Sequence, residues 1–253
     1  MELERKSLEW FTPDTYAVID ERDPNGPYER RVRVVLKKPL PAESFAVLIG
    51  DVLYSLRSAL DNLAYDLNGG DANTKKMANK SEFPIFGNEN RAGDPVDGAT
   101  AHNGTIAGKI FCMCDPAKAI IKGLQPYNRG NRYTDDSLWQ LHTLCNIDKH
   151  RKIHTVAGAY SGIMIDPARM ENFSGNWDYW SHTGPLLDTE TVIARYTAVP
   201  KDPKREVRVN LDPMLDVGLA EGSIMMKHSA TWALQAIQHY VINEAIKPLE
   251  NFV

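Results

Sequence analysis

The sequence has little cysteine and no long uninterrupted apolar run. Its 253 residues include three cysteines, Cys112, Cys114 and Cys145. So few thiols form no recognisable disulfide framework. One residue separates Cys112 from Cys114, whereas zinc and thioredoxin motifs separate their cysteines by two. The pattern therefore favours free thiols, and it predicts no metal and no other cofactor.

Targeting signals are also missing. The charged residues Met1 to Lys6 are not followed by an apolar run of signal-peptide length. No apolar stretch is long enough to span a bilayer. We therefore expect a cytoplasmic protein that has no membrane partner.

The sequence lacks the short motifs of the best-known enzyme classes. It contains no phosphate-binding loop, no dinucleotide fingerprint and no Gly-x-Ser-x-Gly elbow. The formal net charge of -4 argues against a strongly basic nucleic-acid binder, although it permits a local basic patch. What remains is an ordinary globular composition, with 43% hydrophobic and 25% charged residues.

The spacing of apolar residues predicts the main helices. Apolar positions three and four residues apart predict a long helix over 42–68. The same spacing predicts a helix over 135–153 and a C-terminal helix over 229–246. A shorter helix is expected to begin at Asp115 as its N-cap and to end at Gly123.

Alternating and β-branched segments predict the strands. Residues 15–37 read as a hairpin, and further candidate strands cover 154–165, 191–198 and 206–211. We expect an α+β fold in which a helical layer packs against an antiparallel sheet of about five strands. The expected organisation is a single domain over 1–253, and the alternative is a mainly helical core over 40–153 followed by a mainly β part over 154–225.

One carboxylate falls inside an apolar stripe. Asp148 lies seven residues after Leu141 in the predicted helix over 135–153. A buried carboxylate is costly unless a cation pairs with it. Arg57 lies on the edge of the apolar face of the long helix, with Asp61 as its i+4 neighbour. We therefore predict an Arg57–Asp148 ion pair, which either fixes helix register or belongs to a polar pocket with Asp61 and His150.

Other side chains near these positions are candidate ligand contacts. Tyr54 lies on the same side of the long helix as Asp61. Lys149 and Arg151, with the nearby Lys152, Arg129 and Arg132, form a basic cluster that suits a phosphate, RNA or a helix C-terminus.

Histidine spacing and an aromatic loop add two weaker candidates. His150 and His154 have the i, i+4 spacing of metal ligands, but the cations between them disfavour a metal. Trp177 and Trp180 lie in an aromatic loop that can stack a base or cap the core of the sheet.

Several sequence blocks together resemble a known set of proteins. The blocks cover residues 49–53, 56–64, 83–86, 125–127 and 138–151. In this order they resemble blocks shared by a family of uncharacterised bacterial proteins, and the resemblance extends over roughly residues 30–155. It implies no particular activity.

A weaker similarity is to HEPN domains, which are helical modules of bacterial toxin, abortive-infection and defence systems. Many HEPN domains are ribonucleases that use an Arg, four to six residues, and then a His. In this sequence four residues separate Arg57 from Asn62. Asn cannot act as a general base at neutral pH. The resemblance therefore implies either that the titrating residue is lost or that His150 of the other helix replaces it.

Three hypotheses about function follow. The favoured one is a non-catalytic binding or regulatory bacterial protein, linked to host-defence or toxin systems. The first alternative is a HEPN-like ribonuclease that acts on RNA as a homodimer. The second is a small-molecule enzyme with a pocket between the two central helices, closed by residues 81–86 and the aromatic loop. The candidate catalytic residues are Arg57, Asp61, Asn62, Asp148 and His150.

Overall fold

The computed structural model describes most of the chain. The described residues are 1–24, 26, 28–69, 82–87, 105–153, 155–165, 170–174, 179–181, 184–186, 191–209, 211–220 and 228–253. They form two compact units. Unit 1 comprises Met1–Leu48 and His154–Trp232, and unit 2 comprises Ile49–Ile153 and Ala233–Val253. The architecture is α+β, as predicted, and none of the helices in the described part could cross a membrane.

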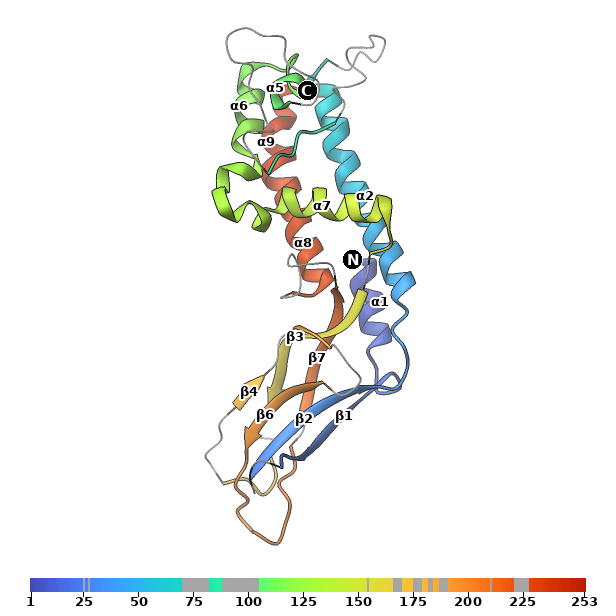
Figure 1. Ribbon diagram of the computed structural model, residues 1–253, viewed down its shortest axis with the longest axis vertical. Helices are drawn as coiled ribbons and strands as arrows, with labels where there is room; N and C mark the ends of the chain where they lie inside the picture. Colours follow the sequence, from blue (N-terminus) through green and yellow to red (C-terminus); the bar gives the residue numbers. More distant parts are fainter. Residues whose placement is uncertain are drawn as a thin grey trace. The chain divides into compact units, whose positions relative to one another are not determined.

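Unit 1 contains two antiparallel sheets (Figure 1). The predicted hairpin is confirmed as β1 (Tyr16–Arg22) and β2 (Glu29–Leu36), which pair from Tyr16 opposite Leu36 to Arg22 opposite Arg30. The first sheet has the strand order β1-β2-β6-β4, and the second has the order β5-β3-β7. The remaining strands are β3 (Thr155–Ile165), β4 (Tyr179–Ser181), β5 (Gly184–Pro185), β6 (Val192–Thr197) and β7 (Leu211–Leu219).

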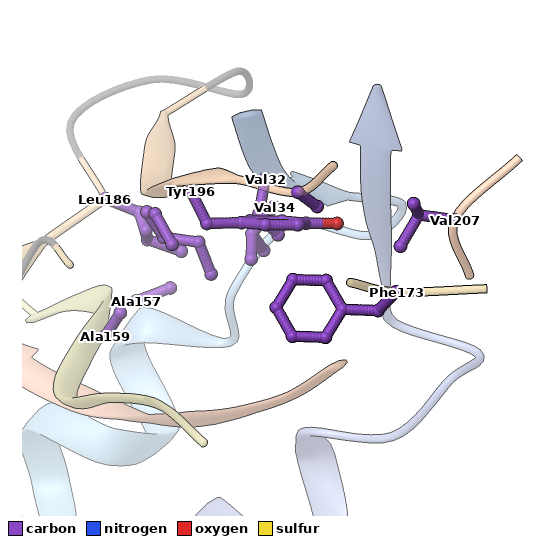
Figure 2. Close-up of a cluster of buried hydrophobic side chains, with 11 residues drawn as sticks. Val32, Val34, Ala157, Ala159, Phe173, Leu186, Tyr196 and Val207 are labelled. Carbon is purple, nitrogen blue, oxygen red and sulfur yellow. The ribbon is translucent and has the colours of Figure 1, made fainter. Parts of the chain in front are cut away.

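Side chains from both sheets form one apolar core in unit 1 (Figure 2). Successive side chains of a strand point to opposite faces, so Val32 and Val34 of β2 lie on the core side together. The core consists of Val32, Val34, Ala157, Ala159, Phe173, Leu186, Ile193, Ala194, Tyr196, Ala198 and Val207.

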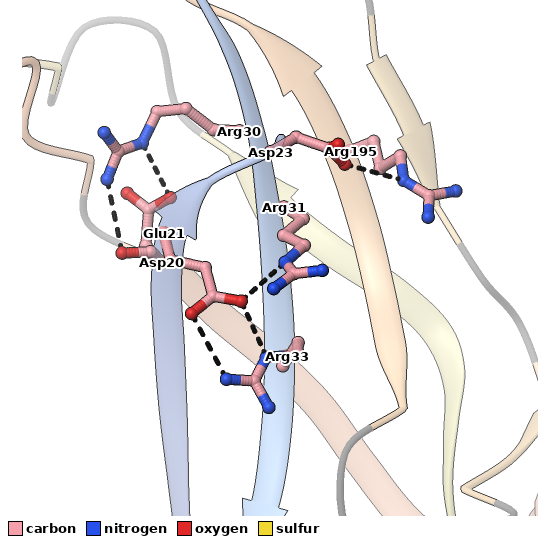
Figure 3. Close-up of polar contacts among 7 residues, drawn as sticks. All are labelled: Asp20, Glu21, Asp23, Arg30, Arg31, Arg33 and Arg195. Atoms are coloured by element: carbon pink, nitrogen blue, oxygen red, sulfur yellow. Dashed lines mark hydrogen bonds and ion pairs between the residues drawn. The ribbon is translucent and has the colours of Figure 1, made fainter. Parts of the chain in front are cut away.

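Ion pairs connect the two strands of the hairpin, and Arg195 of β6 pairs with Asp23 (Figure 3). Glu21 of β1 accepts hydrogen bonds from the Nε atoms of Arg31, at 2.5 Å, and Arg33, at 2.9 Å. These contacts are mainly cross-strand pairs, so they help to fix the register of the sheet. The other pairs drawn there are Arg30 with Asp20 and Arg195 with Asp23.

The β-structure departs from the sequence prediction in three ways. There are two sheets among the described residues instead of one, and the strand expected over 206–211 instead begins at Leu211 as β7. The alternation of Val207 and Val209 suggested a strand, but the described residues there contribute an isolated bridge between Arg208 and Glu171. The helix α1 (Glu2–Trp10) was not predicted, because charged residues fill most of its length.

Unit 2 is helical (Figure 1). The predicted long helix is confirmed as α2 (Ala42–Leu67), whose first residues belong to unit 1 and whose other residues belong to unit 2. Helix α6 (Asp115–Gly123) is capped by Cys114 and not by Asp115, which is its first residue. The other elements before residue 153 are α5 (Ile106–Lys109), η2 (Pro126–Asp135) and α7 (Ser137–His150).

Two predicted helix boundaries need correction. The helix expected over 135–153 is α7, which begins after its N-cap Asp136 and ends at His150. The Asp136 carboxylate accepts a hydrogen bond from the backbone N–H of Leu138 at 2.9 Å. The C-terminal helix expected over 229–246 is divided into several pieces. They are α8 (Ala230–Tyr240), the π-helical turn η5 (Val241–Ile246), α9 (Lys247–Leu249) and η6 (Glu250–Phe252).

The buried hydroxyl of Tyr196 gives a test of the unit 1 core. It donates a hydrogen bond to Asp20 at 2.8 Å, and burial together with the neighbouring Asp20 raises the pKa of Tyr196. We expect Tyr196→Phe to lower the free energy of unfolding by about 1 kcal/mol, because one buried hydrogen bond is lost. Urea unfolding measures this change. Tyr28→Phe, at an exposed ring, is the control, and an equal effect of both substitutions would contradict the assignment.

Candidate functional site

An extended segment, residues 82–87, is held against α2 by side-chain hydrogen bonds. The backbone N–H of Phe83 donates to Asp61 Oδ1 at 2.8 Å, and Arg57 Nη2 donates to the Phe83 carbonyl at 3.0 Å. Asp61 also accepts from Arg57 Nε at 3.2 Å. Buried backbone groups need such partners when no neighbouring strand supplies them. The i, i+4 pair on α2 therefore positions Phe83.

Gln125 fixes the other end of this segment. Its side-chain oxygen accepts from the backbone N–H of Phe86 at 3.1 Å, and its Nε2 donates to the Pro84 carbonyl at 3.0 Å. The backbone N–H of Tyr127 donates to the Phe86 carbonyl at 3.1 Å. Gln125 is almost completely buried, so these polar contacts are part of the interior of unit 2.

The segment forms one side of a cavity within unit 2. The cavity has a volume of about 470 Å³. Helix α2 supplies a cation to it, α7 supplies an aromatic ring and a histidine, and η2 supplies a second ring. The lining residues are Arg57, Glu82, Phe83, Ile85, Phe86, Gly87, Lys109, Tyr133, Trp139 and His142.

The charged groups at this cavity are paired with one another. Arg57 Nη2 lies 3.0 Å from both Asp61 Oδ1 and Glu82 Oε1. Lys109 forms a second ion pair with Glu82. The Arg57 side chain is 9% exposed, and its Nη1 atom has no hydrogen-bond partner within the described part of the chain. The Nε and Nη2 atoms of the guanidinium therefore have partners, whereas Nη1 has N–H donors without an acceptor among the described residues.

The cavity shifts two pKa values. Burial opposes ionisation of Glu82, but the ion pairs with Lys109 and Arg57 outweigh it and lower the Glu82 pKa. Burial and the Arg57 guanidinium also lower the pKa of His142. The amide nitrogen of Asn146 lies 3.0 Å from His142 Nε2. An amide nitrogen can only donate, so Nε2 accepts and the proton of neutral His142 lies on Nδ1.

Aromatic rings form part of the cavity wall. Tyr133 and Trp139 meet edge to face with their centroids 5.0 Å apart. A Cβ atom at Gly87 would lie 2.7 Å from ring carbons of Tyr133 and 2.8 Å from a ring carbon of Trp139. Glycine is therefore required at position 87 for the segment to approach both rings.

The predicted Arg57–Asp148 ion pair is wrong. Asp148 is exposed in the last turn of α7, and a Cβ atom at Gly50 would lie 2.9 Å from one of its carboxylate oxygens. Asp148 therefore lies over α2 at Gly50, about 10 Å along the helix from Arg57 at 1.5 Å per residue. The buried stripe of α7 ends at Cys145. Asp148 remains exposed although it lies against α2 at Gly50, so its position on the predicted stripe does not lead to burial.

The other predicted site residues do not line the cavity. Within α2 and α7, Tyr54, Asn62 and the residues Lys149 and His150 are exposed, and Arg151 follows α7 as its C-cap. Their catalytic and binding roles stay predictions.

Of the two tryptophans in the predicted aromatic loop, the structure describes Trp180. Trp177 lies outside the described residues. Trp180 belongs to β4 in unit 1, is exposed, and carries Arg195 over its ring at 5.8 Å.

The basic cluster is partly structural. Arg129 pairs with the buried N-cap carboxylate of Asp136, and Arg132 pairs with Asp135 at 3.3 Å. Among the described residues no His, Cys, Asp or Glu group of three or more could hold a metal, and none of the three cysteines forms a disulfide. His154 lies outside the described residues, and α7 ends before it.

Sequence reasoning found Arg57 and the segment around Phe83, but it missed most of the cavity. Glu82, Lys109, Tyr133, Trp139 and His142 were not among the predicted site residues. The sequence blocks at 83–86 and 125–127 were the features that pointed to the cavity. They contain the extended segment and Gln125, which holds it. No protein-family model, curated protein or solved structure matches the chain.

Gly87 supplies a test of the cavity wall. We expect Gly87→Ala to destabilise unit 2 by about 1–3 kcal/mol, because the added methyl group meets two rings that already contact each other. Gly123→Ala is the matched control, since a Cβ atom there meets nothing within 4 Å. Thermal and chemical unfolding compare the two variants. Equal stability of both would show that the wall is not packed as described.

His142 should make stability depend on pH. Its folded-state pKa lies below the ordinary value of about 6.5. The unfolded chain therefore binds the proton first, and stability falls as pH drops through about 6.5 towards the lower folded-state pKa. We expect His142→Gln to reduce the change in melting temperature between about pH 7.5 and about pH 5.5. Parallel curves for the variant and the natural chain would refute this role.

Proposed function

We propose that the protein is a non-catalytic binding protein whose unit 2 holds a small polar molecule in the cavity beside Arg57. One observation carries the proposal. Arg57 lines the cavity, and its buried Nη1 has no partner among the described residues. An unsatisfied buried donor costs about 1–3 kcal/mol. A ligand acceptor placed at Nη1 would recover that cost.

The form of the cavity supports the same proposal. A volume of about 470 Å³ lies within the range of about 300–1,000 Å³ that is typical of small-molecule sites. Such sites combine apolar walls with a few convergent polar groups. Here Phe86, Tyr133 and Trp139 supply the walls, and Arg57 with Lys109 supplies donors.

The charge pairing favours binding over catalysis. Glu82 is the carboxylate that lines the cavity, and its lowered pKa makes it a weak base at neutral pH. A general base needs a pKa near the working pH. The small-molecule enzyme hypothesis, with a pocket between the two central helices closed by residues 81–86 and the aromatic loop, stays a prediction.

The ribonuclease alternative also stays a prediction. Arg57 lines the cavity, whereas Asn62 is an exposed residue of α2 that is not among the lining residues. The link to host defence, the RNA partner, the homodimer and the cytoplasmic location are retained as predictions.

Screening with small planar polar molecules tests the proposed function. A ligand that binds the folded chain at about 100 times its Kd stabilises it by about 2.7 kcal/mol, which thermal-shift measurements detect. We expect hits with the natural chain and loss of their shifts in Arg57→Lys. This variant keeps the charge but removes the Nη1 donor.

Two further variants make this test decisive. Trp139→Leu removes part of the cavity wall without touching Arg57, so it should also reduce the shifts. Lys118→Met, on α6 and outside the cavity lining, should leave them unchanged. Far-UV circular dichroism checks that each variant folds. The proposal would be contradicted by ligands that raise the melting temperatures of Arg57→Lys and Trp139→Leu as much as that of the natural chain.

A further inference from the structure

The charges at the cavity cancel. Two cations, Arg57 and Lys109, contact two carboxylates, Asp61 and Glu82, through three ion pairs. His142 is neutral near pH 7, because its pKa is lowered. An anionic ligand would approach Glu82 as well as the cations, so the attraction would be largely offset. The cluster is therefore matched to a ligand without net charge.

The hydrogen-bonding groups specify a donor beside an acceptor. Arg57 Nη1 lacks an acceptor within the described chain. Glu82 has a half-exposed side chain, and an ionised carboxylate has about four acceptor positions on its two oxygens. The ion pairs with Arg57 and Lys109 leave some of these positions for a ligand N–H. Because Arg57 and Glu82 are in contact, the ligand acceptor and donor must be neighbours.

The aromatic walls of the cavity favour a ligand that contains a flat ring. Phe86, Tyr133 and Trp139 are each only partly buried although their rings are large. The cavity is lined by all three, so a ligand ring placed there would remove apolar ring surface from water. Burial of this kind contributes about 25 cal/mol per Å². Aromatic pairs contribute further when they stack offset or edge to face.

We infer that the cavity selects a neutral planar ring that carries a carbonyl next to an N–H, which is an aromatic amide or a lactam such as that of a nucleobase. The carbonyl accepts from Arg57 Nη1, the N–H donates to Glu82, and the ring lies against Tyr133 and Trp139. This inference rests on the proposed function and names the chemical class of its ligand.

Three matched probes separate charge from shape. Benzamide has the neutral amide and the planar ring, benzoate replaces the amide with an anion, and cyclohexanecarboxamide keeps the amide but loses planarity. Ligand-observed NMR titration measures the Kd of each probe for the full chain. We expect benzamide to bind about tenfold more tightly than either of the other two.

A charge substitution inverts the preference. Glu82→Gln removes one carboxylate from the balanced cluster, so the affinity for benzoate should rise about tenfold and exceed that for benzamide. Asp115→Asn, at a nearly fully exposed carboxylate of α6, should change neither affinity.

The outcomes distinguish this inference from the proposed function. Tighter binding of benzoate than of benzamide by the natural chain would overturn the neutral class, although the cavity would still bind small molecules. Equal binding of benzamide and cyclohexanecarboxamide would overturn the planar class in the same way. If no probe binds and the screen of planar polar molecules yields no hit sensitive to Arg57→Lys, the proposed function itself fails.

Discussion

The buried guanidinium of Arg57 is the group on which the candidate site depends. It joins α2 to the segment 82–87 through the Phe83 carbonyl, and Asp61 completes the contact by accepting the Phe83 N–H. An extended segment without a neighbouring strand keeps its polar backbone buried only when side chains supply the missing partners. Arg57, Asp61 and Gln125 do this together. Without them the backbone groups of Phe83, Pro84 and Phe86 would lose these partners in the interior of unit 2, and the cavity would lose one wall.

Much of the fold follows from sequence periodicity, because periodicity reports which face of an element is buried. The spacing of Phe45, Leu56 and Leu63 predicted α2, and the alternation around Val32 and Val34 predicted β2. The same signal failed for Asp148, since a stripe gives the side of a helix but not the extent of the covering surface. It failed also for β7, in which Pro213 and Gly218 weaken the strand pattern while tertiary pairing with β3 decides the structure.

The candidate site was harder to predict because its residues come from four separate parts of the sequence. Arg57 was identified from its position on the edge of an apolar face, and its i+4 neighbour Asp61 is a true partner. The remaining partner, Glu82, is exposed and polar, and nothing local distinguishes it from other surface carboxylates. The contacts that hold 83–86 against Gln125 accompany a fold in which Arg57 and Lys109 meet the same carboxylate, Glu82. That pairing is a tertiary contact, which composition and spacing do not encode.

The structural role of Arg57 and its proposed binding role are compatible because they use different atoms. Guanidinium presents five N–H donors in a fixed plane. Nε and Nη2 contact Asp61, Phe83 and Glu82, which holds the plane in one orientation. Nη1 is then fixed without a partner among the described residues. A ligand of the proposed kind would meet a donor whose orientation has already been set by folding, so its binding would cost little further conformational entropy at this side chain. In the proposed function, the ion pairs that stabilise the segment would therefore also prepare the site for a ligand.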